Sequence, residues 1–154
     1  MMMEINEKLD KDYLALAKFW GQRRSKDPNK KVGAVLVRPD NSVAALCYNG
    51  FPRQMKDLPE EYADRDVKLS KIVHAEMNAL LMARDQDLEG CTLYTWPLPC
   101  CDRCAPHVIQ AGIRRVVAPD VPPDSKWVSS IAKSMEYFDE AGVYISLYAI
   151  EGEE

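Results

Sequence analysis

Two short segments carry a histidine, a glutamate and three cysteines, and they constrain the fold of this chain more than any other feature. The first is His74-Ala75-Glu76, and the second, which begins 24 residues after the glutamate, is Cys100-Cys101-Asp102-Arg103-Cys104. One imidazole and two thiolates are ligands that suit zinc better than magnesium or calcium. Three protein ligands leave the fourth tetrahedral position to water, which is typical of a catalytic zinc. The fold must therefore bring both segments to one ion, with the Glu76 carboxylate near enough to exchange protons with that water.

The composition is ordinary for a globular protein, and it excludes several classes. The 154 residues, 47% hydrophobic and 29% charged, are most simply one domain over residues 1–154. The apolar runs are too short to cross a bilayer, and the N-terminus lacks the layout of a secretory signal, so we expect a cytoplasmic protein without membrane contact. A net charge of −4 argues against a nucleic-acid polymer as partner. Five cysteines, three of them within residues 100–104, suit a reducing compartment and a metal better than a disulfide framework.

Periodicity predicts helices and strands in alternation after an opening hairpin. Residues 10–25 have apolar side chains at helical spacing, and we expect this helix to end before Asp27-Pro28. Two apolar runs, 32–37 and 43–48, flank turn residues and predict the hairpin. Residues 51–70 are charged and predict an irregular loop with one helical turn over 59–65. The remaining expected helices are 74–83, 102–111 and 125–141, and the remaining expected strands are 91–96, 114–118 and 143–150.

This order of elements predicts an α/β fold, a three-layer α/β/α sandwich with a five-stranded mixed sheet. The helix over residues 74–83 is expected to turn Met77, Leu80 and Leu81 inward.

The ligand spacing places the metal at the tips of two helices. Cys101 and Cys104 are three residues apart and share one face of a first helical turn, where thiolates are favoured. His74 stands where another helix begins, and an ideal helix would separate it from Glu76 by roughly 200°. Both side chains therefore reach one ion only if that ion lies at the helix tip.

Two other ligand sets stay open on spacing alone. Cys100 is an alternative to Cys101, although the two-residue spacer between Cys101 and Cys104 is the one typical of zinc sites. His107 follows Cys104 by three residues and would close the site as a structural zinc if it were a fourth ligand.

The pattern H-x-E…P-C-x-x-C is a known signature of zinc nucleobase deaminases. The chain resembles the deoxycytidylate (dCMP) deaminase branch of the cytidine deaminase superfamily, and the likeness covers roughly residues 10–118. It extends to the segments RSKDPN (24–29), VGA (32–34), YNG (48–50), FPR (51–53), HAEMNA (74–79) and IQAGI (109–113).

The resemblance implies a cytidine deaminase-like fold and a single zinc-dependent nucleotide deaminase domain that converts dCMP to dUMP with release of ammonia. It implies Zn²⁺ held by His74, Cys101 and Cys104, with Glu76 as the catalytic proton shuttle. Substrate contacts are expected from Asn49 at the deoxyribose, from Arg24 and Lys26 at the 5′-phosphate, and from Ala75. A homo-oligomer is expected as well, since hexamers are common among relatives.

Two positions depart from the family pattern. Cys100 stands directly before the first ligand, where the family usually has proline, and Gln54 stands where effector-binding members often have glycine. Control by dCTP and dTTP is therefore not implied. Other functions compatible with the same motif are deamination of cytidine, CMP, guanine or tRNA adenosine, or a zinc-stabilised interaction module without catalysis.

Overall fold

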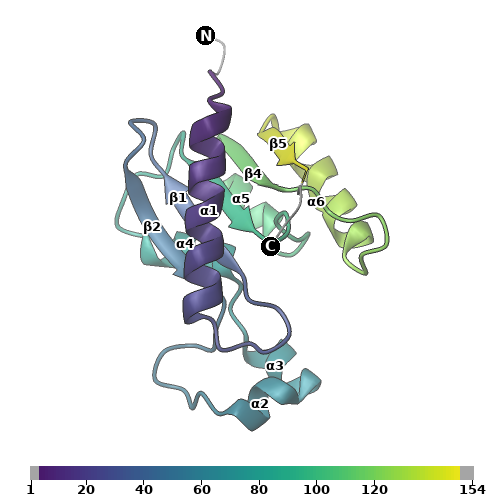
Figure 1. Ribbon diagram of the computed structural model, residues 1–154. Coiled ribbons are helices and arrows are strands. Elements are labelled where there is room, and N and C mark those ends of the chain that lie inside the picture. The colour runs from purple at the N-terminus through teal and green to yellow at the C-terminus, as the bar shows by residue number, and fades with distance from the viewer. Residues whose placement is uncertain (1–3, 150–154) are drawn as a thin grey trace.

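The computed structural model describes residues 4–149, which form one five-stranded sheet with helices packed on its faces (Figure 1). The strands are β1 Gly33–Val37, β2 Val43–Tyr48, β3 Thr92–Trp96, β4 Arg115–Pro119 and β5 Tyr144–Tyr148. The helices are α1 Glu7–Arg24, α2 Pro59–Ala63, α3 Arg65–Lys71, α4 Ala75–Met82, α5 Ala105–Gln110 and α6 Val128–Ala141.

The sheet is mixed, as the sequence predicts. Its strand order is β2-β1-β3-β4-β5. The strand β1 is antiparallel to both β2 and β3, whereas the pairs β3–β4 and β4–β5 are parallel. The hairpin supplies the antiparallel half, and crossovers through α5 and α6 supply the parallel half. The predicted fold class is confirmed.

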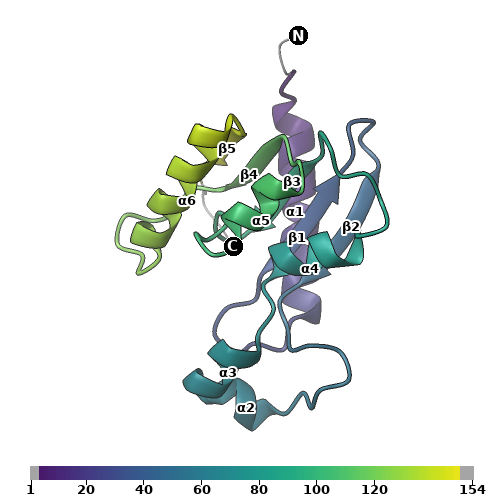
Figure 2. The same cartoon turned by 180° about the vertical axis from the view of Figure 1, so that it is seen from behind.

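Helices cover both faces of the sheet, so the strand β1 is buried on both sides (Figures 1 and 2). Val35 and Val37 pack with residues of α1, whereas Ala34 and Leu36 pack with residues of α4, α5 and α6. The helix α1 approaches so closely that a Cβ on Gly33 would lie 1.8 Å from the carbonyl oxygen of Ala17. Only glycine fits there.

The helix α1 begins earlier than the apolar spacing predicts. Its first residue is Glu7, because the side chain of Asn6 accepts a hydrogen bond from the backbone N–H of Leu9 at 3.0 Å and caps the helix. It ends at Arg24, ahead of Pro28 as expected. Within residues 4–149 no helix is long and apolar enough to cross a membrane.

The expected irregular loop contains two short helices, α2 and α3, which project from one end of the sheet (Figure 1). Gly50 and Val73 pair as an isolated β-bridge and close this segment at its base. The rings of Phe51 and Tyr62 stack with centroids 3.9 Å apart. Gln54 has a φ of 71°, the left-handed conformation that favours glycine. The prediction of one helical turn is therefore wrong for residues 65–71.

The helix α4 packs through small residues rather than through the large ones that the sequence predicts. Ala75, Ala79 and Ala83 are fully buried, which lets the helix lie close to the sheet. Met77 and Leu80 are half-buried against the same core, but Leu81 is 47% exposed. The expectation that Leu81 faces inward is wrong.

The helices α5 and α6 begin three residues later than expected, at Ala105 and Val128. A hydrogen-bonded turn over residues 102–104 precedes α5, and the backbone N–H of Ala105 still donates to the carbonyl of Cys101 at 3.0 Å. The chain therefore already curls like a helix at Cys101. Gly142 ends α6 with a φ of 77°, in agreement with its expected role as a helix stop.

Candidate metal centre

The candidate site lies at one edge of the sheet, where several loops meet. In the register of the sheet Gly33 is opposite both Tyr48 and Trp96, so β1 begins where β2 and β3 end. The chain enters α4 and α5 from the same edge. Ligands of α/β proteins commonly bind outside the carboxyl ends of strands.

The structure brings the predicted metal ligands together. Ligand atoms of His74, Glu76, Cys101 and Cys104 all lie within 4.8 Å of one another. His74 is the residue that caps the start of α4, and Cys104 caps the start of α5. The two helix tips therefore converge, which is the geometry that the ligand spacing requires.

The distances in this cluster fit a tetrahedral zinc. His74 Nδ1 lies 3.5 Å from the Sγ of Cys101 and 3.3 Å from the Sγ of Cys104. Zinc at about 2.3 Å from sulfur and about 2.0 Å from nitrogen would hold these atoms about 3.5 Å apart. The donor set of one imidazole and two thiols also matches zinc chemistry.

Neither alternative ligand belongs to the group of candidate ligands, although the Cys100 thiol contacts that of Cys104. Cys100 is buried in the hydrophobic core and does not belong to the cluster of candidate ligands, whereas Cys101 does. His107 is exposed, and its Nδ1 lies 3.2 Å from the carbonyl oxygen of Arg103, so it does not turn towards the cluster. Among the described residues the site thus has three candidate metal ligands and one carboxylate.

The protonation of the cluster reflects its close contacts. The hydrogen bond with Cys101 raises the pKa of the His74 imidazole. Hydrogen bonds with Cys104 and with His74 together lower the pKa of the Cys101 thiol to about 4. Hydrogen bonds with Cys100 and Cys101 raise the pKa of the Cys104 thiol. One sulfur of the pair is therefore already poised as a thiolate, the form that binds metal.

Glu76 lies in the first turn of α4 and is only 5% exposed. Burial raises the pKa of its carboxyl group, although the neighbouring His74 partly offsets this effect. A carboxyl group whose pKa is raised holds its proton more readily, which suits a group that must both accept and donate one.

Two serines of α6, which the sequence did not point to, form hydrogen bonds with the segment of residues 100–104 that carries the cysteines. Ser134 donates from Oγ to the carbonyl of Cys100 at 2.7 Å. Ser130 donates to the Asp102 carboxylate at 2.7 Å and accepts from the Asp102 backbone N–H at 3.2 Å. The sequence offers one indication of their role: two polar residues four positions apart lie on the inner side of α6, where apolar residues are expected.

A cavity of about 130 Å³ opens beside the cluster. Ala75 and Asn49 both line it, as the predicted substrate contacts should. The Asn49 Oδ1 accepts hydrogen bonds from Ser25 Oγ and the backbone N–H of Val32, and its Nδ2 donates to the carbonyl of Lys30. Asn49 therefore also fixes the loop of residues 25–32. The cavity is lined by Asp27, Lys30, Val32, Asn49, Lys68, Leu69, Ile72, His74, Ala75, Glu76, Leu98, Pro99, Cys101 and Trp127.

The structure places neither Arg24 nor Lys26 on this cavity, contrary to expectation. Arg24 still belongs to α1, and its guanidinium group lies 5.6 Å from the centroid of the Trp20 ring, beside a different groove. Lys26 forms an ion pair with Asp57 at 2.6 Å. Arg24, in the last turn of α1, therefore lines the groove rather than the cavity.

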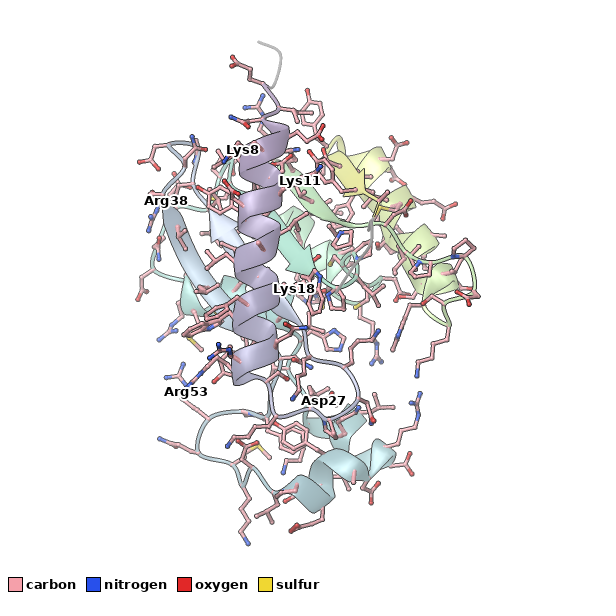
Figure 3. All side chains as sticks on the ribbon, viewed as in Figure 1. Lys8, Lys11, Lys18, Asp27, Arg38 and Arg53 are labelled. Atoms are coloured by element: carbon pink, nitrogen blue, oxygen red, sulfur yellow. The ribbon has the colours of Figure 1, made fainter. Side chains whose placement is uncertain are left out.

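Different cations line the cavity instead, namely Lys30 and Lys68. Lys68 of α3 forms an ion pair with Asp27 at 3.2 Å, and both side chains are largely buried. Figure 3 shows Asp27 below the end of α1, on the side away from Arg53. The sequence did not predict the contact between Lys68 and Asp27, because it did not predict α3 itself.

Comparisons with known proteins agree with this geometry. Residues 7–119 match the family model described as the cytidine and deoxycytidylate deaminase zinc-binding region. An uncharacterized deaminase in the luxG 3′ region of Aliivibrio fischeri is 38% identical over 124 residues, which cover 79% of this chain and 82% of that protein. The deoxycytidylate deaminase of Homo sapiens is 38% identical over 111 residues. That match covers 69% of this chain but only 62% of the human protein.

A solved structure shares the fold. The dCMP deaminase of cyanophage S-TIM5, determined in complex with dCMP and dUMP, superposes with a TM-score of 0.72 at 20% sequence identity. The superposition covers 94% of this chain and 100% of the phage protein. With the metal-ligand cluster and the match over residues 7–119, these similarities lead to one conclusion: the chain belongs to the zinc-binding cytidine and deoxycytidylate deaminase family.

Proposed function

We propose that this protein is a zinc-dependent aminohydrolase that converts dCMP and water to dUMP and ammonia. The observation that carries the proposal is the cluster of one histidine, two cysteines and a buried glutamate at the floor of a cavity. Among relatives, the human protein is a deoxycytidylate deaminase, and the phage enzyme of the same fold was solved with dCMP and dUMP. Both support dCMP as the substrate.

In this proposal His74, Cys101 and Cys104 hold the zinc. A zinc ion held there would supply an activated water, because coordination lowers the pKa of the bound water to near neutrality. Glu76 would accept the first proton of that water and pass it to the cytosine ring nitrogen as the oxygen adds to the carbon that bears the amino group. It would then take the second proton, from the added hydroxyl group, and deliver it to the amino group, so that the C–N bond breaks and ammonia leaves. The raised pKa of Glu76 suits both steps.

The walls of the cavity orient the substrate. Cytosine would enter between the cluster and the turn at Leu98 and Pro99, next to Ala75. Asn49, held by three hydrogen bonds of its own, would contact the deoxyribose with the remaining N–H of its side-chain amide.

Substitution of Glu76 tests the reaction. Glu76→Ala should bind zinc as the wild type does and lose deamination of dCMP by about 10²–10⁴-fold, the range that general acid–base catalysis contributes. Zinc content by atomic absorption and ammonia release are the readouts, and Glu136→Gln, an exposed change on α6, is the control. Normal turnover of dCMP by zinc-loaded Glu76→Ala would refute the role of Glu76.

A cytoplasmic homo-oligomer, with the hexamer of its relatives as one form, completes the proposal. Free cysteines at all five positions suit a reducing compartment. A groove beside α1 and α4 is lined by the exposed apolar side chains of Met55, Leu81 and Met82, and subunit contacts would cover it. Light scattering that gave the mass of a single 17.5 kDa chain would exclude the oligomer.

A further inference from the structure

A second cavity lies at the edge of the sheet opposite the metal cluster. Val37, the last residue of β1, is opposite Thr92, and Thr92 is opposite Arg115, so β1 ends at this edge and β3 and β4 begin there. Figure 3 shows Arg38 beside this edge, whereas Asp27 lies beyond the other end of α1. The cavity measures about 420 Å³, which is within the size range of pockets that bind small molecules. It shares no described lining residue with the cavity beside the metal cluster.

Three arginines line this second cavity, and one of them is neutralised. Arg115 forms a buried ion pair with Asp10, so these two charges cancel. Arg38 and Arg114 line the cavity as well, but within residues 4–149 neither forms an ion pair with a carboxylate. The remaining carboxylate of the lining, Glu4, is exposed to solvent. The lining therefore carries a net positive charge.

Neutral hydrogen-bond acceptors hold Arg38 in position. Its Nη1 donates to Ser42 Oγ at 3.0 Å and to the carbonyl of Val43 at 3.1 Å, and its Nη2 donates to Gln86 Oε1. The carboxylate of Asp40, close by in the hairpin turn, accepts from Ser42 Oγ at 2.6 Å instead. A guanidinium group fixed by neutral partners keeps its charge and is already oriented for an oxyanion.

Apolar side chains lie beside these cations. Ile5, Leu9 and Pro39 line the same cavity, and Ile5 is 55% exposed. Arg114 is exposed too, and its guanidinium group lies 5.9 Å from the centroid of the Tyr144 ring. Cationic and apolar groups in one cavity suit a ligand that has an anionic group and an apolar part.

We propose that this cavity binds a small phosphate monoester, with its phosphate group between Arg38 and Arg114. A phosphate monoester carries close to two negative charges and several strong acceptor oxygens, which match two guanidinium groups. The apolar part of the ligand contacts Ile5, Leu9 and Pro39. This site is separate from the metal centre and does not depend on the proposed function.

Phenyl phosphate, which has both a phosphate group and an apolar ring, is the probe for this site. Titration of the zinc-loaded protein, followed by the NMR signals of backbone amides, should show saturable shifts at Asn41, Gly90 and Thr92, which line the cavity. Inorganic phosphate should shift the same amides but bind more weakly, because it lacks the apolar part.

Substitutions in the lining test the charge of the site. Arg38→Gln and Arg114→Gln should each raise the Kd of phenyl phosphate about 10-fold or more, given the usual strength of a hydrogen bond between charged groups. Glu4→Gln should lower the Kd, because it removes a negative charge from the lining. The matched control is Arg65→Gln, an exposed change on α3 away from both cavities, and it should leave the Kd unchanged.

Three outcomes would overturn the proposal. They are the absence of saturable shifts at the three amides, shifts confined to residues around the metal cluster, and a Kd in Arg38→Gln and Arg114→Gln equal to that of the control. Arg114 is exposed, so Arg114→Gln should fold even if Arg38→Gln, which loses the bonds to the hairpin, does not. The Kd of Arg114→Gln then decides.

Discussion

Asp10 shows how a single residue joins elements that are distant in the sequence. It is 1% exposed and forms an ion pair with Arg115. It also accepts hydrogen bonds from Tyr94 Oη at 2.6 Å and Tyr148 Oη at 2.5 Å. Although burial opposes its ionisation, the hydrogen bonds from Arg115, Tyr148 and Tyr94 hold its pKa below the usual 3.8. The first helix is thereby anchored to three strands of the sheet.

Asp10→Asn should destabilise the protein by about 3 kcal/mol, because it leaves the charge of Arg115 buried without a partner. The folded pKa is lowered, so the stabilisation is complete above the unfolded value near 3.8 and is lost as the pH falls through the folded value. Urea unfolding from pH 2 to pH 7 would measure this. The variant should lose less stability than the wild type at acid pH. Parallel pH curves would contradict the role of Asp10.

The site residues could be predicted where the chemistry of the metal fixes both the residue type and the spacing between residues. His74, Cys101 and Cys104 follow from the ligand demands of zinc and Glu76 from the need for a proton carrier beside it, and the structure brings all four together. The residues that line the cavity were not predictable in the same way. Whether Arg24 or Lys30 reaches it depends on where α1 ends and on how the next loop turns, and contacts that are distant in the sequence decide both.

At the level of elements, α3 forms one wall of the cavity and is held by a buried ion pair. Lys68 on α3 contacts Asp27, which also accepts from the backbone N–H of Asn29 at 2.9 Å and of Lys30 at 3.3 Å. The same carboxylate thus fixes α3 and the loop that carries Lys30.

Lys68→Gln should lower the free energy of unfolding by about 3 kcal/mol, since it leaves the Asp27 carboxylate buried and unpaired. The control is Lys26→Gln, which breaks the more exposed pair with Asp57 and should cost less than about 1 kcal/mol. Urea unfolding of both variants measures the difference. Equal losses would show that the Lys68 pair does not anchor α3.

The elements that sequence predicted and those that it missed differ in what stabilises them. The strands and the helices α1, α4, α5 and α6 have apolar patterns, so periodicity locates them to within a few residues. The helices α2 and α3 are mostly charged, and contacts with the rest of the fold hold them, such as the Lys71 ammonium group 4.5 Å from the centroid of the Phe51 ring. A short helix without an apolar stripe leaves little signal in its own sequence.

For the whole molecule, the mixed sheet explains why one edge carries the site. Because β1 runs opposite to β2 and β3, the loops that carry Lys30, Asn49, Pro99 and Trp127 leave the same edge as the starts of α4 and α5. The order of elements predicted such a sheet, but not the strand order that brings these loops together. That residues 1–154 form a single deaminase domain stays a prediction.

The proposed catalysis depends on a zinc ion with three protein ligands and one open position. X-ray absorption at the zinc edge of the metal-loaded protein measures this directly. We expect two sulfur ligands at about 2.3 Å, one imidazole nitrogen at about 2.0 Å and one further light atom from water. A third sulfur, as Cys100 would provide, or a second imidazole, as His107 would provide, would show a closed site and contradict the proposed catalysis.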